Sequence, residues 1–272
     1  MPPPILQRGD EVLLRESGTA SKGVVSLAQG SQICPMAVRR KSLPLPPIHE
    51  RLTLLSQAVG MVASKFSPSL ILVGPPGLGK THEVTRTLRA LGLERDHDYF
   101  HIKGYASARG LYETLYRHNG CILVFDDCDN ALTDPVAVEL LKGALDSYDV
   151  RTIAWLTAAK NAGQIPPRFD FTGSVIFISN RMLADIDEAV HNRSLVIDLQ
   201  MSRAEILERM QTLLPHVETN ATAEQRRLAM RFIREWAPSI QQLSLRTLIS
   251  VLRIIRANPR SWESLAIYAT TK

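Results

Sequence analysis

The feature that most constrains the fold is the segment GPPGLGKT at residues 74–81. It fits the pattern G-x-x-x-x-G-K-[ST], in which glycines let the backbone wrap closely around phosphate groups. The apolar run SLILVG at 69–74 precedes it, and a helical pattern over 81–92 follows it. Backbone N–H groups of such a loop and of the helix N-terminus form an anion site. The segment therefore predicts a buried parallel strand that leads into a phosphate-binding loop.

The candidate phosphate-binding residues are this loop and the residue after it: Gly74, Pro75, Pro76, Gly77, Leu78, Gly79, Lys80, Thr81 and His82. We expect Lys80 to reach the β- and γ-phosphates of a nucleotide. Thr81 is expected to place its hydroxyl on Mg²⁺.

A second apolar strand ends in carboxylates, in the segment CILVFDDCDN at 121–130. A phosphate-loop protein needs such a strand to bring a carboxylate to Mg²⁺. Asp126 is the expected metal-binding residue, acting through the water shell of the ion. Asp127 is the expected general base that polarises the attacking water. Asp129 lies beyond the strand, and we interpret it as a residue that caps the loop.

The rest of the chain alternates between strand and helix patterns and then becomes wholly helical. Strands are expected at 69–74, 99–104, 121–125, 151–157, 173–180 and 194–199, and helices between them at 48–64, 81–92, 107–119 and 134–147. This alternation indicates an α/β fold, a parallel sheet flanked by helices. Further helices are expected at 202–214, 222–236, 241–256 and 261–269. The expected domains are a small β-rich N-terminal module with its linker at 1–46, a nucleotide-binding domain at 47–201 and a helical lid at 202–272.

The 272 residues are 45% hydrophobic and 22% charged, which is ordinary for a globular protein. The sequence has no apolar run long enough to span a bilayer, and its first residues lack a signal-peptide pattern. Its three cysteines have no metal-like spacing. We therefore expect a cytoplasmic protein with no membrane partner.

Positive charge gathers at the two ends of the chain. Residues 1–46 carry six Lys/Arg and three Asp/Glu, whereas residues 202–272 carry 11 and six. The middle, 47–201, carries 15 and 18 and is net acidic. Basic ends can dock on nucleic acid or on an acidic neighbouring subunit; a solvated helical surface is the alternative.

Together these motifs make the chain resemble the AAA+ ATPases over about residues 48–260. The middle section also resembles ATPases encoded by bacteriophages, on the segments KGYASARGLYETLY, VFDDCDNAL, LKGALDS and VIFISN. The resemblance implies that ATP and Mg²⁺ bind at subunit interfaces of a homo-oligomer. A closed ring, such as a hexamer, is the usual form.

The resemblance also assigns roles to polar residues outside the phosphate loop. Asn180, which ends a strand, corresponds to the residue that senses the γ-phosphate. Arg193 lies where many members carry the arginine finger that acts on the neighbouring subunit's nucleotide, with Arg168 and Arg181 as competitors. Arg246 corresponds to the arginine of the lid. The adenine pocket is expected between the lid and the Ile48–His49 junction.

The chain departs from the family pattern at Asp127, where many members carry the longer glutamate. Either the backbone compensates and ATP is hydrolysed, which we favour, or the site is a nucleotide-gated switch with little hydrolysis.

The ATP cycle would drive nucleic-acid remodelling, with DNA or RNA as partner. Alternatively, it would drive a protein remodeller or assembly chaperone, with 1–46 recruiting the protein substrate. A small-molecule kinase is a third alternative. Tyr105 is interpreted either as an aromatic pore-loop residue or as a core residue.

Overall fold

The structure is a computed structural model, and it describes residues 45–148, 150–156 and 165–271. Leu45–Lys272 form one compact unit, distinct from Met1–Pro44. The β-rich strands expected within 1–46 lie outside the described residues.

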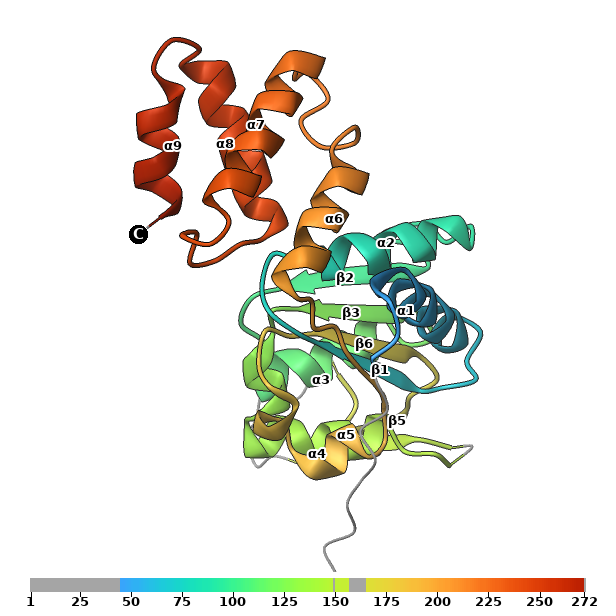
Figure 1. The fold of residues 1–272 in the computed structure, drawn as a ribbon. Coiled ribbons are helices and arrows are strands. Elements are labelled where there is room, and N and C mark those ends of the chain that lie inside the picture. Colours follow the sequence, from blue (N-terminus) through green and yellow to red (C-terminus); the bar gives the residue numbers. More distant parts are fainter. Residues whose placement is uncertain (1–44, 149, 157–164, 272) are drawn as a thin grey trace, which may run out of the picture. The chain divides into compact units, whose positions relative to one another are not determined.

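The described residues form a five-stranded parallel sheet in the order β2-β3-β6-β1-β7 (Figure 1). Its strands are β1 (Ser69–Val73), β2 (Tyr99–Lys103), β3 (Ile122–Asp126), β6 (Ser174–Ile178) and β7 (Leu195–Asp198). The three central strands, β3, β6 and β1, are buried throughout, which explains their continuous apolar sequences. The predicted parallel sheet is confirmed.

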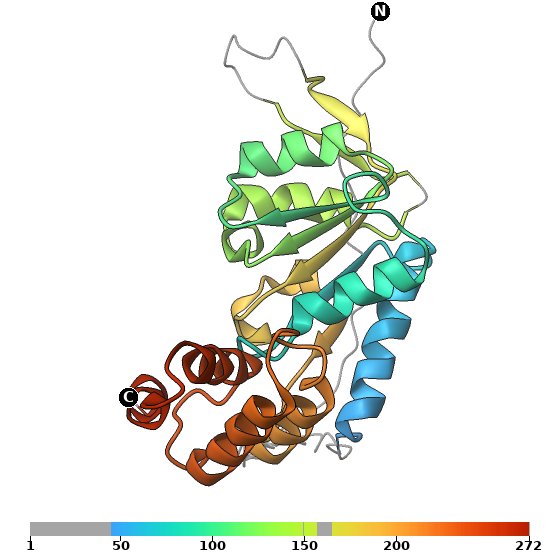
Figure 2. The same cartoon turned by 90° about the horizontal axis from the view of Figure 1, so that it is seen from above.

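Helices cover both faces of this sheet (Figure 2). One face packs against α1 (Ile48–Ala63) and α2 (Lys80–Ala90), and the other against α3 (Ala108–Arg117) and α4 (Pro135–Ala144). Because side chains alternate along a strand, Leu70 and Leu72 of β1 join the first core, while Ile71 and Val73 join the second.

The C-terminal segment is helical, as expected. It contains α6 (Arg203–Leu213), α7 (Ala223–Trp236), α8 (Leu245–Ala257) and α9 (Trp262–Thr270), which share an apolar core. Ser202 and Thr222 cap α6 and α7 through reciprocal side-chain and backbone hydrogen bonds. Leu78 of the phosphate loop is 2% exposed and belongs to this same core. The phosphate loop is therefore packed directly against the lid.

The strand expected at 151–157 does not join the main sheet. Instead, β4 (Thr152–Ala154) pairs antiparallel with β5 (Arg168–Asp170) in a separate sheet. Only Ile153 of β4 is buried, so the segment lacks the two buried faces of a central strand. The sequence patterns also do not predict β5 and three short helices, η1 (Asp129–Leu132), η2 (Leu183–Asp185) and α5 (Glu188–His191). Within the described part of the chain, every helix is too short or too polar to cross a membrane.

Candidate active site

A cavity of about 400 Å³ lies where the phosphate loop, the acidic strand and the lid meet. It is lined by Gly77, Gly79, Lys80, Thr81, His82, Lys103, Asp126, Asp127, Ile178, Asn180, Leu213, His216, Val217, Leu245, Arg246 and Ile249. Most of the predicted site residues are thus brought together at the carboxyl ends of parallel strands, where ligands of such sheets bind.

Two glycines of the phosphate loop are required by close backbone contacts. A Cβ on Gly74, whose φ is +143°, would lie 2.5 Å from the carbonyl oxygen of Leu199. A Cβ on Gly77, whose φ is +76°, would lie 2.7 Å from the Ser244 Cβ. Gly77 also accepts a hydrogen bond at 2.9 Å from the backbone N–H of Leu245. The loop therefore fits between β7 and the start of α8 only because it lacks these side chains.

Lys80 lies inside the loop and is 5% exposed. Its Nζ donates to the carbonyl oxygens of Gly74 and Pro75 at 2.5 and 2.9 Å, and to Asn180 Oδ1 at 2.8 Å. Burial lowers the pKa of Lys80 to about 8, while Asp127 and Asp126 act in the opposite direction. The ammonium therefore remains the main form at neutral pH, ready to bind phosphate oxygens.

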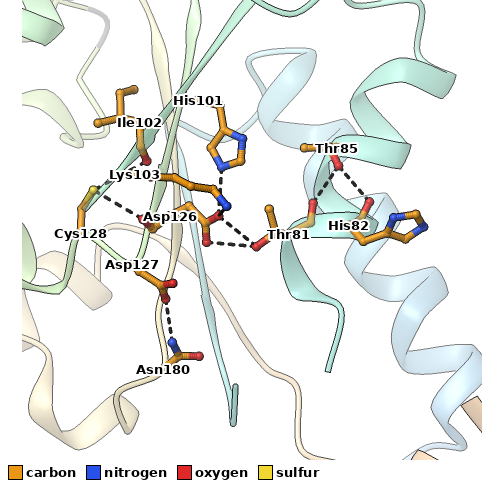
Figure 3. A network of polar contacts seen from close by, with 10 residues as sticks. All are labelled: Thr81, His82, Thr85, His101, Ile102, Lys103, Asp126, Asp127, Cys128 and Asn180. Carbon is orange, nitrogen blue, oxygen red and sulfur yellow. Dashed lines mark hydrogen bonds and ion pairs between the residues drawn. The ribbon is translucent and has the colours of Figure 1, made fainter. Parts of the chain in front are cut away.

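Asp126 is 2% exposed and is contacted by three side chains (Figure 3). The Thr81 hydroxyl donates to its two carboxylate oxygens at 3.0 and 3.1 Å. Asp126 Oδ2 also contacts His101 Nε2 and Lys103 Nζ, each at 3.0 Å. Thr81 and Asp126 were predicted from the sequence, whereas His101 and Lys103, both on the neighbouring strand β2, were not.

Asp127 follows the last residue of β3 and has a left-handed backbone, with φ +57°. Its Oδ1 accepts a hydrogen bond at 2.7 Å from Asn180 Nδ2 (Figure 3). Since Asn180 Oδ1 accepts from Lys80, one amide connects the loop lysine to the second aspartate. Lys80 and Asn180, the two residues expected to contact the γ-phosphate, thus lie in direct contact with each other.

Asp129 connects the acidic strand to the segment after β6. Its Oδ1 accepts a hydrogen bond at 2.6 Å from Ser179 Oγ, and its Oδ2 lies 3.7 Å from Arg181 Nε. The backbone N–H of Arg181 donates to Ser179 Oγ at 3.0 Å. These contacts hold both sides of the turn that carries Asn180, so Asp129 stabilises more than its own loop.

Buried Cys128 separates these aspartates. Burial, followed by the nearby carboxylates, raises the pKa of its thiol to about 11. This side chain therefore stays a neutral packing residue.

The lid supplies Arg246 in the first turn of α8, where it lines the cavity and influences Lys80 electrostatically. Pro75, Pro76 and Arg246 also line a second cavity, of about 700 Å³, between the loop and the lid.

Arg193 lies elsewhere, just before β7 and therefore at the amino-terminal edge of the sheet. Its Nη1 donates to the carbonyl oxygen of Ala189 at 2.9 Å. The phosphate loop follows the opposite, carboxyl-terminal edge. Of its competitors, Arg168 begins β5 in the separate hairpin, while Arg181 is bound to Asp129.

A further cavity of about 590 Å³ adjoins the site and shares His82, Leu213 and His216 with it. His49 lines this cavity, whereas Ile48 is 6% exposed and packs in the core below. A cavity therefore lies between the start of α1 and the lid, where the adenine pocket is expected, with His49 on its wall.

The side-chain oxygen atoms of Thr81, Asp126, Asp127 and Asn180, which line the cavity of about 400 Å³, fit Mg²⁺, which prefers hard oxygen ligands and keeps several waters. They comprise a hydroxyl, carboxylates and an amide oxygen. Among the described residues there is no cluster of three or more His, Cys, Asp or Glu that could hold a metal by itself. A site of this kind would bind Mg²⁺ together with nucleotide phosphates, with Thr81 and Asp126 as the protein residues.

Comparisons with known proteins identify the fold of the chain. No family model matches the chain. Two mutant forms of RuvB of Thermotoga maritima share its fold with TM-scores of 0.51 and 0.52, at 15% sequence identity. These similarities cover 82% and 81% of this chain and 69% of each RuvB chain. The chain thus shares the fold of these RuvB forms, an AAA+ ATPase-like P-loop fold.

A more specific relationship is to a phage protein. The chain is 26% identical over 241 residues to an "Uncharacterized 36.7 kDa protein in nrdC-mobD intergenic region" of Enterobacteria phage T4. This similarity covers 80% of this chain and 73% of the phage protein. It agrees with the expected resemblance to phage-encoded proteins, as a distant relationship.

Proposed function

We propose that this protein is an ATPase that binds ATP with Mg²⁺ between subunits of a homo-oligomeric ring and hydrolyses it to ADP and phosphate. The observation that carries the proposal is the contact chain from Lys80 through Asn180 to Asp127. It lies in the same cavity as the Thr81–Asp126 pair. A site that only held phosphate would not need a carboxylate and an amide placed together beyond the metal-binding residues.

In the proposed reaction, a water oxygen attacks the γ-phosphorus and the bond to the β–γ bridging oxygen breaks. Asp127 takes the proton of the water, and Asn180 orients both the water and this carboxylate. Lys80 and Arg246 stabilise negative charge on phosphate oxygens, and Arg193 of the neighbouring subunit does so from the other side. Bound Mg²⁺ would neutralise charge on the β- and γ-phosphates.

Steady-state phosphate release by the assembled protein tests this proposal, with Asp126→Ala as the control. We expect turnover in the wild type and none in the control. Nucleotide binding without turnover above the control would instead favour the nucleotide-gated switch.

We further propose that the ATP cycle drives remodelling of a nucleic acid. This proposal is supported by the excess of Lys and Arg in residues 202–272. Addition of DNA or RNA at low salt should change the rate of ATP hydrolysis, and salt should suppress the effect. An unchanged rate with every nucleic acid tested would contradict it.

Protein remodelling is the second candidate, because Tyr105, in the segment after β2, is 83% exposed. Its interpretation as a core residue is therefore wrong, and an exposed aromatic ring can contact an extended protein chain. Under this alternative, Tyr105→Ala would uncouple ATP hydrolysis from a protein substrate while leaving the basal rate unchanged.

A further inference from the structure

The lid carries a groove of about 610 Å³ between the end of α6 and one side of α7. Its lining is entirely different from that of the nucleotide cavity: Gln211, Leu214, Pro215, Ala223, Arg226, Arg227, Met230, Arg231 and Arg234. Four of these residues are arginines, and among the described residues that line the groove none is acidic. The groove therefore combines an apolar floor with concentrated positive charge.

Three of the arginines are exposed and form a row along α7. Arg227, Arg231 and Arg234 are spaced by four and three residues, so they project from one side of the helix. The spacing from the first to the third corresponds to roughly 10 Å along the helix axis. The groove thus presents a line of guanidinium groups rather than a single charge.

The existing contacts of this row leave it open to an external anion. Arg227 pairs with Glu224 through side chains that are 75% and 56% exposed. Such exposed pairs are weak, because water and salt screen the attraction between the two charges. Arg234 donates to the neutral amide oxygen of Gln211 at 3.0 Å. Within the described part of the chain, Arg231 makes neither a hydrogen bond nor an ion pair, although it feels the charge of Glu224.

We propose that this groove binds the sugar–phosphate backbone of a nucleic acid, with Arg227, Arg231 and Arg234 donating to successive phosphates. Guanidinium forks match phosphate oxygens in geometry and charge. One strand carries a phosphate about every 3.4 Å of duplex axis, so the row spans about three of them. The proposal rests on the proposed coupling to nucleic acid and assigns the lid surface that makes the contact.

A matched pair of charge reversals tests the groove: Arg231→Glu within it and Arg260→Glu outside it. Arg260 is also an exposed residue of the lid, so both changes alter its net charge equally. Neither residue is part of the nucleotide site. Basal phosphate release and thermal unfolding of the two variants should therefore match the wild type.

The probe is a fluorescein-labelled single strand of DNA of about 30 nucleotides, and its duplex, each titrated with full-length protein and a non-hydrolysable ATP analogue. We expect Arg231→Glu to weaken binding about tenfold and Arg260→Glu to change it less than about twofold. The triple variant Arg227→Glu/Arg231→Glu/Arg234→Glu should reduce the slope of log affinity against log salt by roughly 3.

Each other outcome contradicts the groove assignment in a distinct way. Equal affinities of the two single variants would mean that nucleic acid binds elsewhere, with the coupling to nucleic acid intact. No DNA binding by a wild type that hydrolyses ATP would overturn both the groove and the coupling, but not the ATPase. Binding of poly-glutamate in place of DNA would indicate an acidic protein partner. Loss of oligomers in Arg231→Glu would indicate a subunit interface.

Discussion

At the scale of single residues, the backbone explains why position 127 carries aspartate. Its φ of +57° lies in the left-handed region, which aspartate and asparagine enter more readily than residues with longer side chains. Asn180 reaches the short carboxylate at 2.7 Å. The shorter stem thus suits a turned backbone and does not by itself indicate loss of hydrolysis.

The first prediction compares two substitutions at this position. Asp127→Asn keeps the shape and the left-handed preference but removes the base, so the rate of phosphate release should fall by about 10²–10⁴-fold. Asp127→Glu restores a carboxylate but places a longer residue in a left-handed conformation. It should lower the unfolding free energy by about 1 kcal/mol. Phosphate release and thermal unfolding measure the two effects. An Asp127→Glu protein more stable than wild type would refute the backbone explanation.

The second prediction concerns Lys103, whose ammonium contacts the carboxylate that is expected to serve the metal. Lys103→Met removes a competing cation from an exposed side chain, so half-saturation should need about two- to fivefold less divalent cation. Electron paramagnetic resonance of Mn²⁺, in the presence of a non-hydrolysable ATP analogue, measures the concentration of Mn²⁺ at half-saturation without turnover. Lys142→Met on α4 is the control, since among the described residues Lys142 pairs only with Glu139. An increased requirement for Mn²⁺ would mean that Lys103 assists metal binding.

Most of the candidate site was predictable because its residues follow strands directly. His101 and Lys103 were missed although the sequence contains a signal. They are two residues apart on β2, so they lie on one face beside the acidic strand, with Lys103 in register with Asp126. The cavity wall formed by Leu213, His216 and Val217 could not be predicted, because it depends on how the lid folds back.

At the scale of elements, ion pairs and packing attach the lid to α1 and α2. Arg209 of α6 pairs with Glu83 of α2, which is 1% exposed. Arg51 of α1 pairs with Glu205 of α6. Leu78 places the phosphate loop in the lid core. A movement of the loop on nucleotide binding would therefore be transmitted to α6.

The third prediction concerns Glu205, which closes the cap of α6 and accepts a hydrogen bond from Arg51. The Ser202 backbone N–H, and then the Ser202 hydroxyl and Arg51, lower the pKa of Glu205. Its stabilisation is therefore present above the unfolded-state pKa and is lost as the pH falls through the lowered value. Glu205→Gln should reduce the melting temperature by about 2–4 °C near neutral pH.

Melting curves recorded from about pH 7 down to about pH 3 should show this difference disappearing in acid. Glu235→Gln is the control, because Glu235 is an exposed acid of the same lid without a hydrogen bond or ion pair among the described residues. A difference that persists at the acid end would show that Glu205 acts through packing and not through its charge.

Helices and strands were predictable where the burial of their residues agrees with the spacing of apolar residues in the sequence. The fully buried strands β1, β3 and β6 and the capped lid helices were each expected close to their observed bounds. The β4–β5 hairpin was not, since Arg168–Asp170 offers three residues with no buried position and no pattern to read. Pairing of such short strands is decided by the elements around them.

At the scale of the whole molecule, one expected catalytic residue lies away from the phosphate loop of its own chain. Arg193 and the phosphate loop lie at opposite edges of a parallel sheet. If Arg193 completes the site, it must do so in a neighbouring copy, and an isolated subunit would be inactive. Repeating one such head-to-tail contact around an axis closes a ring.

The fourth prediction is therefore complementation between two inactive proteins. Lys80→Met should lose nucleotide binding, and Arg193→Ala should lose about 10³–10⁵-fold in turnover. In an equal mixture, an Arg193→Ala subunit supplies an intact Lys80, and a neighbouring Lys80→Met subunit supplies an intact Arg193. The site at their shared interface is then complete. Random assembly makes about one quarter of the interfaces complete, so about a quarter of the wild-type rate should return. Phosphate release from mixed oligomers measures this.

The same mixture with Arg168→Ala in place of Arg193→Ala separates the two arginines. A mixture that stays inactive would exclude Arg193 as the residue acting between subunits, and full activity in a monomer would favour a kinase-like enzyme.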